Sequence, residues 1–580
     1  MLKRLLGCVR EYKRPTLVSL VFIVLEAIVE TAIPFITADL VNRIKAGADV
    51  GHILTTGALL IALAAVSLTS GGVAGVASAR ASAGFAKNLR TDIFRKIGTY
   101  GFENIDRFSS SSLVTRMTTD VANVQMSYMV IIRTAIRAPL MLLFSIVMAY
   151  VMGGILAMTF VVVVPVLAFG LIMIARFAMP AFRRVFRKYD RLNESIEENV
   201  RGMRVVKGFS REEYEKEKFT AAAENIRADF TKAERIVALN SPLMQVCLYF
   251  NMIFVMLVGS RLAVSSGGTT VDVGQLSAML TYGMQILMSL MMLSMIYVIL
   301  TMSSESIKRI GELLDETPSL TSPENALTEV ADGSVELSGV SFKYSKTARR
   351  EALSGIELSI ASGMTVGILG GTGSGKTTLV QLIPRLYDVT EGCVRVGGED
   401  VRRYDLDTLR SSVAMVLQKN QLFSGTIREN LRWGNPDATD EEMREACRLA
   451  AADEFISAFP DGYDTRIEQG GANVSGGQKQ RLCIARALLR RPKILILDDS
   501  TSAVDMRTDA AIRAGLRTYV PDTTKIIIAQ RVASVMEADL ILLMENGTIA
   551  ARGTHEELLA TSEHYRELCE QQMGGASDEE

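Results

Sequence analysis

A glycine-rich stretch has the residue types and the spacing needed to hold phosphate groups. It follows the pattern of a glycine, four free residues and Gly-Lys-Thr, and it consists of Gly370, Gly371, Thr372, Gly373, Ser374, Gly375, Lys376 and Thr377, followed by Thr378. Glycines let successive backbone N–H groups turn inward around phosphate oxygens, while Lys376 supplies a mobile positive charge and the Thr377 hydroxyl can bind Mg²⁺. We therefore expect a site for a nucleoside triphosphate.

The surroundings of this loop support the same prediction. A buried-strand pattern, Met364–Leu369, precedes it, and the run after it can open as a helix, whose N-terminus adds a positive dipole end. Further along, Lys493–Asp498 predicts a buried strand that ends in an acid, where a second ligand for Mg²⁺ should lie. Strands and helical runs mix from 334 to 580, which predicts an α/β nucleotide-binding domain.

Composition limits the function classes open to the chain. Its 580 residues carry a net charge of −1, so bulk charge gives no indication of a nucleic-acid partner. Hydrophobic residues make up 48% and are concentrated in the first half, as in a membrane protein. The six cysteines are scattered, which predicts neither a zinc site nor a disulfide framework.

The first half contains apolar segments of the length that spans a bilayer, about 20 residues. We expect an all-α membrane domain at 1–311, with six spans near Thr16–Ala38, Ile53–Ala77, Ile131–Met152, Ile155–Ala178, Pro242–Ala263 and Leu276–Met302. Long periodic segments after the second and fourth spans predict helices that extend into the cytosol, with two independent loops as the alternative. A polar stretch at 312–333 is the expected linker to the nucleotide-binding domain.

Basic residues predict the orientation in the membrane. Clusters of Lys and Arg precede the first span and follow the second and fourth, so they share one side if the N-terminus is inside. We expect a multi-pass protein of the cell membrane, embedded in the lipid bilayer, with the N-terminus and the nucleotide-binding domain in the cytoplasm. No small-residue cleavage site follows the basic start, which predicts an anchor and not a removable signal peptide.

Some side chains within the spans are candidates for a substrate pathway. Glu26 and Glu30 share one face of the first span, where a carboxylate is costly and usually faces a cavity or a partner. A pathway for cations and a structural pairing both remain open. Met288 and Met292 belong to a methionine-rich last span, which suits adaptable binding surfaces, although plain packing is the more common role.

A second motif of the nucleotide-binding domain carries a resemblance to a known family. A Ser-Gly-Gly-Gln ahead of a helix is the signature of the ATP-binding cassette (ABC) family, here Ser475, Gly476, Gly477 and Gln478. The resemblance implies that Tyr344 stacks on adenine and that Gln418 contacts Mg²⁺ and the membrane domain. It also implies that the segment 502–505, which ends in Asp505, crosses a dimer interface.

The resemblance covers the first half as well, because six spans fused ahead of one cassette look like a half-transporter of the ABC exporter type. It implies binding of ATP with Mg²⁺, and a dimer in which each ATP lies between one phosphate loop and the partner's signature motif. It also implies two short coupling helices that rest on the cassettes, near Phe102–Phe108 and Ser210–Glu217.

Two positions depart from the family pattern at residues that the family uses for ATP hydrolysis. The family places a Glu after the strand-ending Asp as the general base, and this chain has the shorter Asp499. A misplacement of about one ångström can cost roughly 10²-fold in rate. The family's switch His is replaced by Gln530, which donates a hydrogen bond but carries no imidazolium charge. Gln469, before the signature, stands where exporters usually have Glu.

These departures predict the hydrolytically weak subunit of a heterodimer. Its intact signature would complete the active site of a second half-transporter that has a catalytic Glu and a switch His. A homodimeric exporter with low ATPase activity, and an ATP-gated regulator or channel, are the alternatives. The substrate class stays open among amphipathic or cationic drugs, lipids and peptides.

Overall fold

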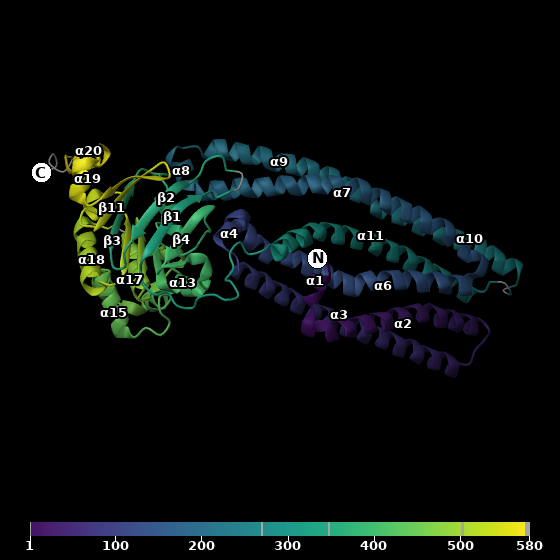
Figure 1. The fold of residues 1–580 in the computed structure, drawn as a ribbon. Coiled ribbons are helices and arrows are strands. Elements are labelled where there is room, and N and C mark those ends of the chain that lie inside the picture. The colour runs from purple at the N-terminus through teal and green to yellow at the C-terminus, as the bar shows by residue number, and fades with distance from the viewer. Residues whose placement is uncertain (1, 268, 270, 346–347, 500–503, 575–580) are drawn as a thin grey trace. The chain divides into compact units, whose positions relative to one another are not determined.

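The computed structural model describes residues 2–267, 269, 271–345, 348–499 and 504–574 (Figure 1). The chain divides into two compact units. A helical unit comprises Met1–Gly98 and Ser109–Glu316, and a sheet unit comprises Thr99–Phe108 and Thr317–Glu580.

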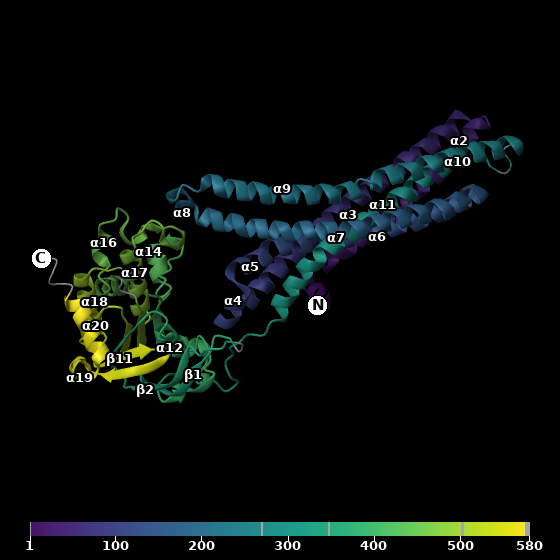
Figure 2. The same cartoon turned by 90° about the horizontal axis from the view of Figure 1, so that it is seen from above.

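Long helices make up the helical unit (Figures 1 and 2). Those with apolar segments are α2 (Lys13–Lys45), α3 (Val50–Gly98), α6 (Val121–Gly153), α7 (Met158–Arg201), α10 (Asn240–Ser265) and α11 (Val273–Asp315). The others are α1 (Leu2–Gly7), α5 (Ser110–Thr115), α8 (Met203–Gly208) and α9 (Glu212–Val237), with shorter helical turns at Arg10–Tyr12, Arg116–Asp120 and Gly154–Ala157.

Five continuous helical stretches of the described chain are long and apolar enough to cross a membrane. They are Arg10–Lys45, Val50–Gly98, Ser110–Val185, Glu212–Ser265 and Val273–Asp315. The third stretch holds α6 and the first part of α7, because the turn at Gly154–Ala157 joins them without a break in helical structure. Gly154 has φ +46°, a conformation that glycine adopts without strain. The six predicted spans all lie within these helices.

An ionic cluster links α2 to α6 inside the apolar segments. Arg137 of α6 lies 2.7 Å from a carboxylate oxygen of Glu30 and 3.4 Å from one of Glu26. A Cβ on Gly71 of α3 would lie 3.0 Å from Glu26 Oε1, so this glycine leaves room for the carboxylate. The structural pairing that the sequence left open is thus present, and its cation, Arg137, was not predicted.

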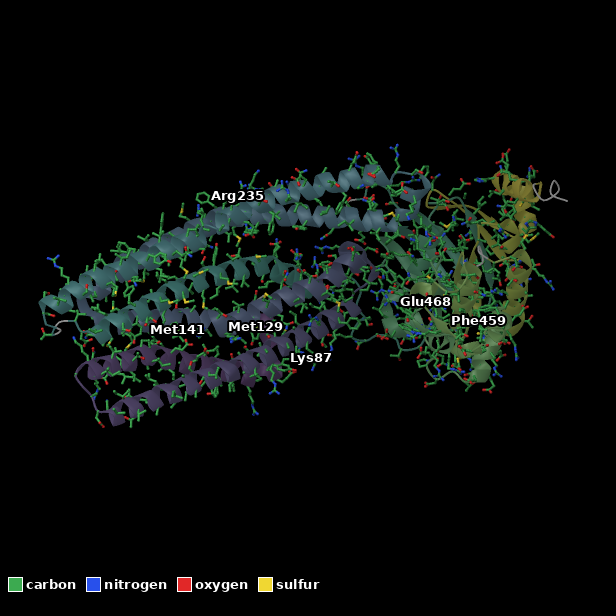
Figure 3. The ribbon with its side chains drawn as sticks, turned by 180° about the vertical axis from the view of Figure 1, so that it is seen from behind. Lys87, Met129, Met141, Arg235, Phe459 and Glu468 are labelled. Atoms are coloured by element: carbon green, nitrogen blue, oxygen red, sulfur yellow. The ribbon has the colours of Figure 1, made fainter. Side chains whose placement is uncertain are left out.

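Two further contacts join helices near this cluster. Thr31 of α2 approaches Met141 of α6, which is labelled in Figure 3, with 3.9 Å between the hydroxyl oxygen and the sulfur. The buried Tyr282 of α11 donates a hydrogen bond of 2.9 Å to the carbonyl oxygen of Thr31. Three helices that lie far apart in sequence are therefore joined at one level of the bundle.

The sheet unit contains two larger sheets and a two-stranded ribbon. The six-stranded sheet has the order β12 (Thr548–Gly553), β11 (Leu540–Glu545), β3 (Thr365–Gly370), β10 (Thr524–Ile528), β9 (Ile494–Asp498), β6 (Val413–Val416). All neighbours in it are parallel except β11 and β12. The four-stranded antiparallel sheet has the order β2 (Leu353–Ile360), β1 (Val335–Phe342), β4 (Glu391–Val396), β5 (Glu399–Asp400), and the ribbon pairs β7 (Gly425–Thr426) with β8 (Arg466–Ile467).

Both faces of the six-stranded sheet are covered. Ile494 and Ile496 of β9 belong to one buried cluster, whereas Leu495 and Leu497 belong to another. Parallel strands buried on both faces read as continuous apolar runs, which is why β9 could be recognised in the sequence. The helices of this unit are α4 (Phe102–Phe108), α12 (Lys376–Leu382), α13 (Leu406–Ser412), α14 (Ile427–Leu431), α15 (Asp440–Leu449), α16 (Asp453–Ser457), α17 (Gly476–Leu488), α18 (Met506–Tyr519), α19 (His555–Thr561) and α20 (Glu563–Gly574).

Of the two expected coupling helices, the structure has a short helix at the predicted position of the first but not of the second. The first coincides with α4, Phe102–Phe108. The second was placed wrongly: the short helix is α8, Met203–Gly208, and Glu212 begins the long helix α9. Ser210, with φ +52°, interrupts the helix between them, and the acidic first turn of α9 favours a helix start there.

We predict that Arg137→Gln destabilises the helical unit by about 3 kcal/mol, because it leaves two partly buried carboxylates without their cation. Thermal unfolding of the purified protein in one detergent measures this loss. Adding Glu26→Gln and Glu30→Gln should restore most of it, and Arg261→Gln, which removes an exposed arginine from α10, is the matched control. An unchanged unfolding temperature for Arg137→Gln would show that the cluster does not hold α2 to α6.

Candidate nucleotide-binding site

Three loops that carry predicted residues begin at one edge of the six-stranded sheet. Ile528 of β10 pairs with Ile368 of β3 and with Asp498 of β9, so these parallel strands end together. The glycine loop follows β3, while Asp499 follows β9 and Gln530 lies just after β10. Ligands of open α/β sheets bind outside the carboxyl ends of the strands. This edge is therefore the candidate site.

The glycine loop folds around its own lysine. The Lys376 ammonium donates hydrogen bonds of 2.8 and 2.7 Å to the carbonyl oxygens of Gly370 and Gly371. A Cβ on Gly370 would lie 2.2 Å from the carbonyl oxygen of Met544, so only glycine fits there. Gly375 has φ +99° and directly precedes α12. The predicted order of strand, loop and helix is therefore present.

A cavity of about 420 Å³ adjoins the loop. Its lining includes the loop residues 373–378 and Tyr344, together with Arg350 and Asn546. Arg350 donates a hydrogen bond of 2.8 Å to the side-chain oxygen of Asn546. Neither residue is predicted from the sequence to lie at this site. The Asn-Gly pair at 546–547 is a hairpin signal that locates a turn between strands, but it does not place that turn beside the phosphate loop.

Tyr344 is half exposed at the cavity. Its hydroxyl lies 2.9 Å from the hydroxyl of Thr378, and its ring packs edge-on against Phe342 and Tyr387, with centroids 4.9 and 5.3 Å apart. Burial raises the pKa of Tyr344, so the phenol stays neutral at physiological pH. An aromatic ring held in this way offers a surface against which a flat ligand can pack.

Thr377 and Asp498 bring two hard oxygen ligands together. The Thr377 hydroxyl donates a hydrogen bond of 3.1 Å to Asp498 Oδ1. Burial raises the pKa of Asp498, while burial lowers that of Lys376, and the two opposite charges act against both shifts. Mg²⁺ in nucleotide sites takes few protein oxygens and completes its shell with phosphate and water. This pair fits such an ion, and no cluster of three or more His, Cys, Asp or Glu suited to a metal occurs among the described residues.

The two unusual residues contact each other. Gln530 Nε2 donates a hydrogen bond of 2.7 Å to Asp499 Oδ2, and Gln418 Nε2 approaches the same oxygen at 3.4 Å. Asp499 is 8% exposed, and its backbone has φ +49°. Gln418, which follows β6, thus comes to the same edge as the other predicted residues. The Asp499 carboxylate is held by side-chain amides of its own chain.

The signature motif lies apart from this cavity in the described chain. Ser475 caps α17: its hydroxyl accepts a hydrogen bond from the backbone of Gln478, whose side chain accepts one from the backbone of Ser475. Ser475 and Gly476 are exposed, and Gly477 and Gln478 are partly exposed. None of the described residues that line the cavity belongs to this motif.

Two further predicted positions lie near helix ends. Gln469 is exposed in a short helical turn, Gln469–Gly471, before the signature. Asp505 caps α18 and accepts a hydrogen bond of 2.9 Å from the backbone N–H of Thr508. Residues 502 and 503, the start of the segment expected to cross a dimer interface, lie outside the described residues.

The helix α4 contacts Tyr387 within its own unit. Tyr387 donates a hydrogen bond of 2.7 Å to the carboxylate of Asp106, and its ring lies 5.9 Å from that of Phe102. Burial raises the pKa of Tyr387, and the Asp106 carboxylate acts in the same direction. Since Tyr387 also packs on Tyr344, α4 is connected through one ring to the wall of the cavity.

The methionines of α11 present an exposed surface in the single chain. Met288 and Met292 are 46% and 38% exposed, and Met284, Met291 and Met295 are exposed beside them. Met279 is fully buried and packs inside the helical unit, whereas the five methionines named above do not.

Family models cover most of the chain. A model described as the ABC transporter transmembrane region matches residues 16–290, and a model described as ABC transporter matches residues 353–502. The chain is 34% identical over 578 residues to an uncharacterised ABC transporter ATP-binding protein, YfiB, of Bacillus subtilis (strain 168), which covers 100% of both chains.

Two other similarities extend this result. A fatty acid ABC transporter ATP-binding/permease protein of Mycobacterium bovis (strain ATCC BAA-935 / AF2122/97) is 34% identical over 480 residues, covering 83% of this chain and 75% of the relative. A solved structure of a bacterial Atm1-family ABC exporter with ATP bound has a TM-score of 0.85 at 24% identity and covers 97% of this chain and 99% of its own. The chain therefore belongs to the ABC transporter family: it joins a transmembrane region to an ATP-binding domain and has the fold of an Atm1-family exporter.

Proposed function

We propose that this chain is the hydrolytically weak half of a heterodimeric, ATP-driven exporter. The exporter fold fused to an ATP-binding domain supports the general activity. The observation that carries the finer proposal is the hydrogen bond of 2.7 Å from Gln530 to Asp499.

That hydrogen bond joins the two residues at which hydrolysis would be controlled. A general base must come within about 2.6–3.2 Å of the water that it activates. Asp499 is one methylene shorter than Glu, and one of its oxygens is engaged by Gln530 and approached by Gln418. The Gln530 amide stays neutral and supplies no positive charge to a developing negative one. ATP at this edge is therefore bound but hydrolysed slowly.

The binding residues are those of the loop and the cavity. Lys376 and the backbone of the loop contact the phosphates, and Thr377, Asp498 and Gln418 serve Mg²⁺, which neutralises phosphate charge when bound. Tyr344 packs on the adenine. The exposed signature Ser475–Gln478, with Asp505, acts on the partner's nucleotide, because it lies outside the cavity of its own chain.

The arrangement in the membrane follows from charge. We propose a membrane domain at 1–311, a linker at 312–333 and a nucleotide-binding domain at 334–580. Basic clusters flank the first, second and fourth spans on one side, which supports a cytoplasmic N-terminus and a cytoplasmic nucleotide-binding domain.

An amphipathic substrate suits the helical unit best. The exposed methionines of α11 form an adaptable apolar surface, and a relative of 34% identity is named as a fatty acid transporter. Glu26 and Glu30 are engaged with Arg137, so a cationic substrate would have to compete with an ion pair already formed. A homodimer with low activity and an ATP-gated regulator remain the competing assignments.

We predict that Asp499→Glu combined with Gln530→His raises ATP hydrolysis at this site by about 10²-fold. The longer Glu side chain can reach the attacking water, and the His can carry a positive charge beside the γ-phosphate. The measurement is phosphate release by the assembled pair whose partner phosphate-loop Lys is replaced by Ala. Lys376→Ala added to the same protein should abolish the gain. Gln469→Glu also introduces the residue that exporters usually have, but outside the cavity, and it is the control that should not produce the gain. If the double variant hydrolyses no faster than the parent, the diagnosis of this site is wrong.

We also predict that Met288→Ser with Met292→Ser raises the half-saturating concentration of an amphipathic substrate by about tenfold, because apolar contact area is lost. ATP-dependent uptake of a fluorescent fatty acid into inverted vesicles measures it. Met302→Ser, at an equally exposed position further along α11, is the matched control. Equal half-saturation in all three proteins would remove these methionines from the substrate path.

A further inference from the structure

A groove on the outer face of the helical unit runs between α2 and α3. Its volume is about 500 Å³, within the ~300–1,000 Å³ range of ligand pockets. Its walls are mainly apolar and include Val18 of α2 with Val73 and Val76 of α3, while Arg14 and Arg80 also line it. The groove therefore combines hydrocarbon walls with two cations.

Contacts between the two helices place both arginines at the same end of the groove. Tyr12 packs where a Cβ on Gly84 would lie, and Ser19 donates a hydrogen bond of 3.3 Å to the carbonyl oxygen of Ala74. The helices are thus antiparallel in this register. Arg14 and Arg80 both fall between these two contacts, on the side away from the apolar centres of the spans.

The groove exists because a small residue lines it. A Cβ on Gly72 would meet nothing within 4 Å, so the absence of a side chain there leaves the groove open. Outside it, large aliphatic side chains such as Leu17, Val21 and Leu68 are exposed, as expected of a surface that faces lipid.

The charges of the groove are not neutralised from within. Arg10, close by, forms two hydrogen bonds of 2.9 Å with Asp92. By contrast, neither Arg14 nor Arg80 forms an ion pair or side-chain hydrogen bond with any residue that the structure describes, and both are exposed. Lys87, labelled in Figure 3, lies two turns beyond Arg80 on α3, where its charge acts on the nearby Glu11 carboxylate.

We propose that this groove binds an anionic phospholipid of the surrounding bilayer. The phosphate lies between Arg14 and Arg80, and one acyl chain lies along Val18, Val73 and Val76. Basic pockets between transmembrane helices recognise anionic head groups in this way, and guanidinium groups pair with phosphate through two hydrogen bonds. The site is separate from the nucleotide-binding edge, so the proposal does not depend on which half of the transporter hydrolyses ATP.

Native mass spectrometry of the assembled transporter tests it, after extraction from vesicles of equal phosphatidylglycerol and phosphatidylcholine. We expect the parent protein to retain phosphatidylglycerol selectively. Arg14→Gln with Arg80→Gln should reduce that selectivity by about 25-fold, at roughly fivefold for each guanidinium. Gly72→Leu should reduce retention of both lipids, because the new side chain fills the groove without a clash.

Two matched variants control for general effects. Gly57→Leu adds the same side chain to α3 where a Cβ also meets nothing within 4 Å, and Arg95→Gln removes an exposed arginine from α3 far from the groove. Both should behave like the parent. Equal retention of the two lipids by the parent, or unchanged selectivity in the double arginine variant, overturns the proposal. Loss of subunit assembly in Gly72→Leu would also overturn it, since the groove would then hold the partner subunit.

Discussion

The parallel register of three strands is the constraint on which the candidate site depends. Because Ile528 pairs with both Ile368 and Asp498, the chain must leave β3, β9 and β10 at one edge of the sheet. The glycine loop, Asp499 and Gln530 come from distant parts of the sequence, and this register brings them to the same edge. Two buried clusters, one on each face, hold the strands in place.

Within that frame, one hydrogen bond links the two departures from the family pattern. Asp499 and Gln530 are 31 positions apart, and their side chains meet at 2.7 Å. The two positions that the sequence singled out therefore form one hydrogen-bonded pair. The same logic applies in the helical unit, where Arg137 pairs with Glu26 and Glu30. A charge that is costly in an apolar setting is retained where a partner from another helix meets it.

Features with local sequence signals were predictable, and features set by tertiary contacts were not. The glycine loop, the strand ending at Asp498 and the six apolar segments each have a pattern within a short window. The structure has the loop, the strand and helical structure over all six segments, which lie in five continuous stretches. The contact between Gln530 and Asp499 depends on strand order, which no local pattern specifies. Arg350 and Asn546 reach the cavity for the same reason.

Small errors of position also have a physical origin. The sequence placed the second coupling helix over Ser210–Glu217, yet the chain breaks at Ser210 and the acidic residues after it begin a longer helix. Helical propensity alone does not distinguish the end of one helix from the start of the next. Arg137 lay inside a predicted span, but only the packing of α6 against α2 shows which acids it meets.

The most direct measurement is the chemical state of the nucleotide held by this chain during turnover. The assembled transporter is incubated with radiolabelled azido-ATP and Mg²⁺, cross-linked by light, and separated into its two chains. The account predicts that the nucleotide attached to this chain is mainly triphosphate while the partner's is mainly diphosphate. Diphosphate on this chain in the same proportion as on the partner would contradict it.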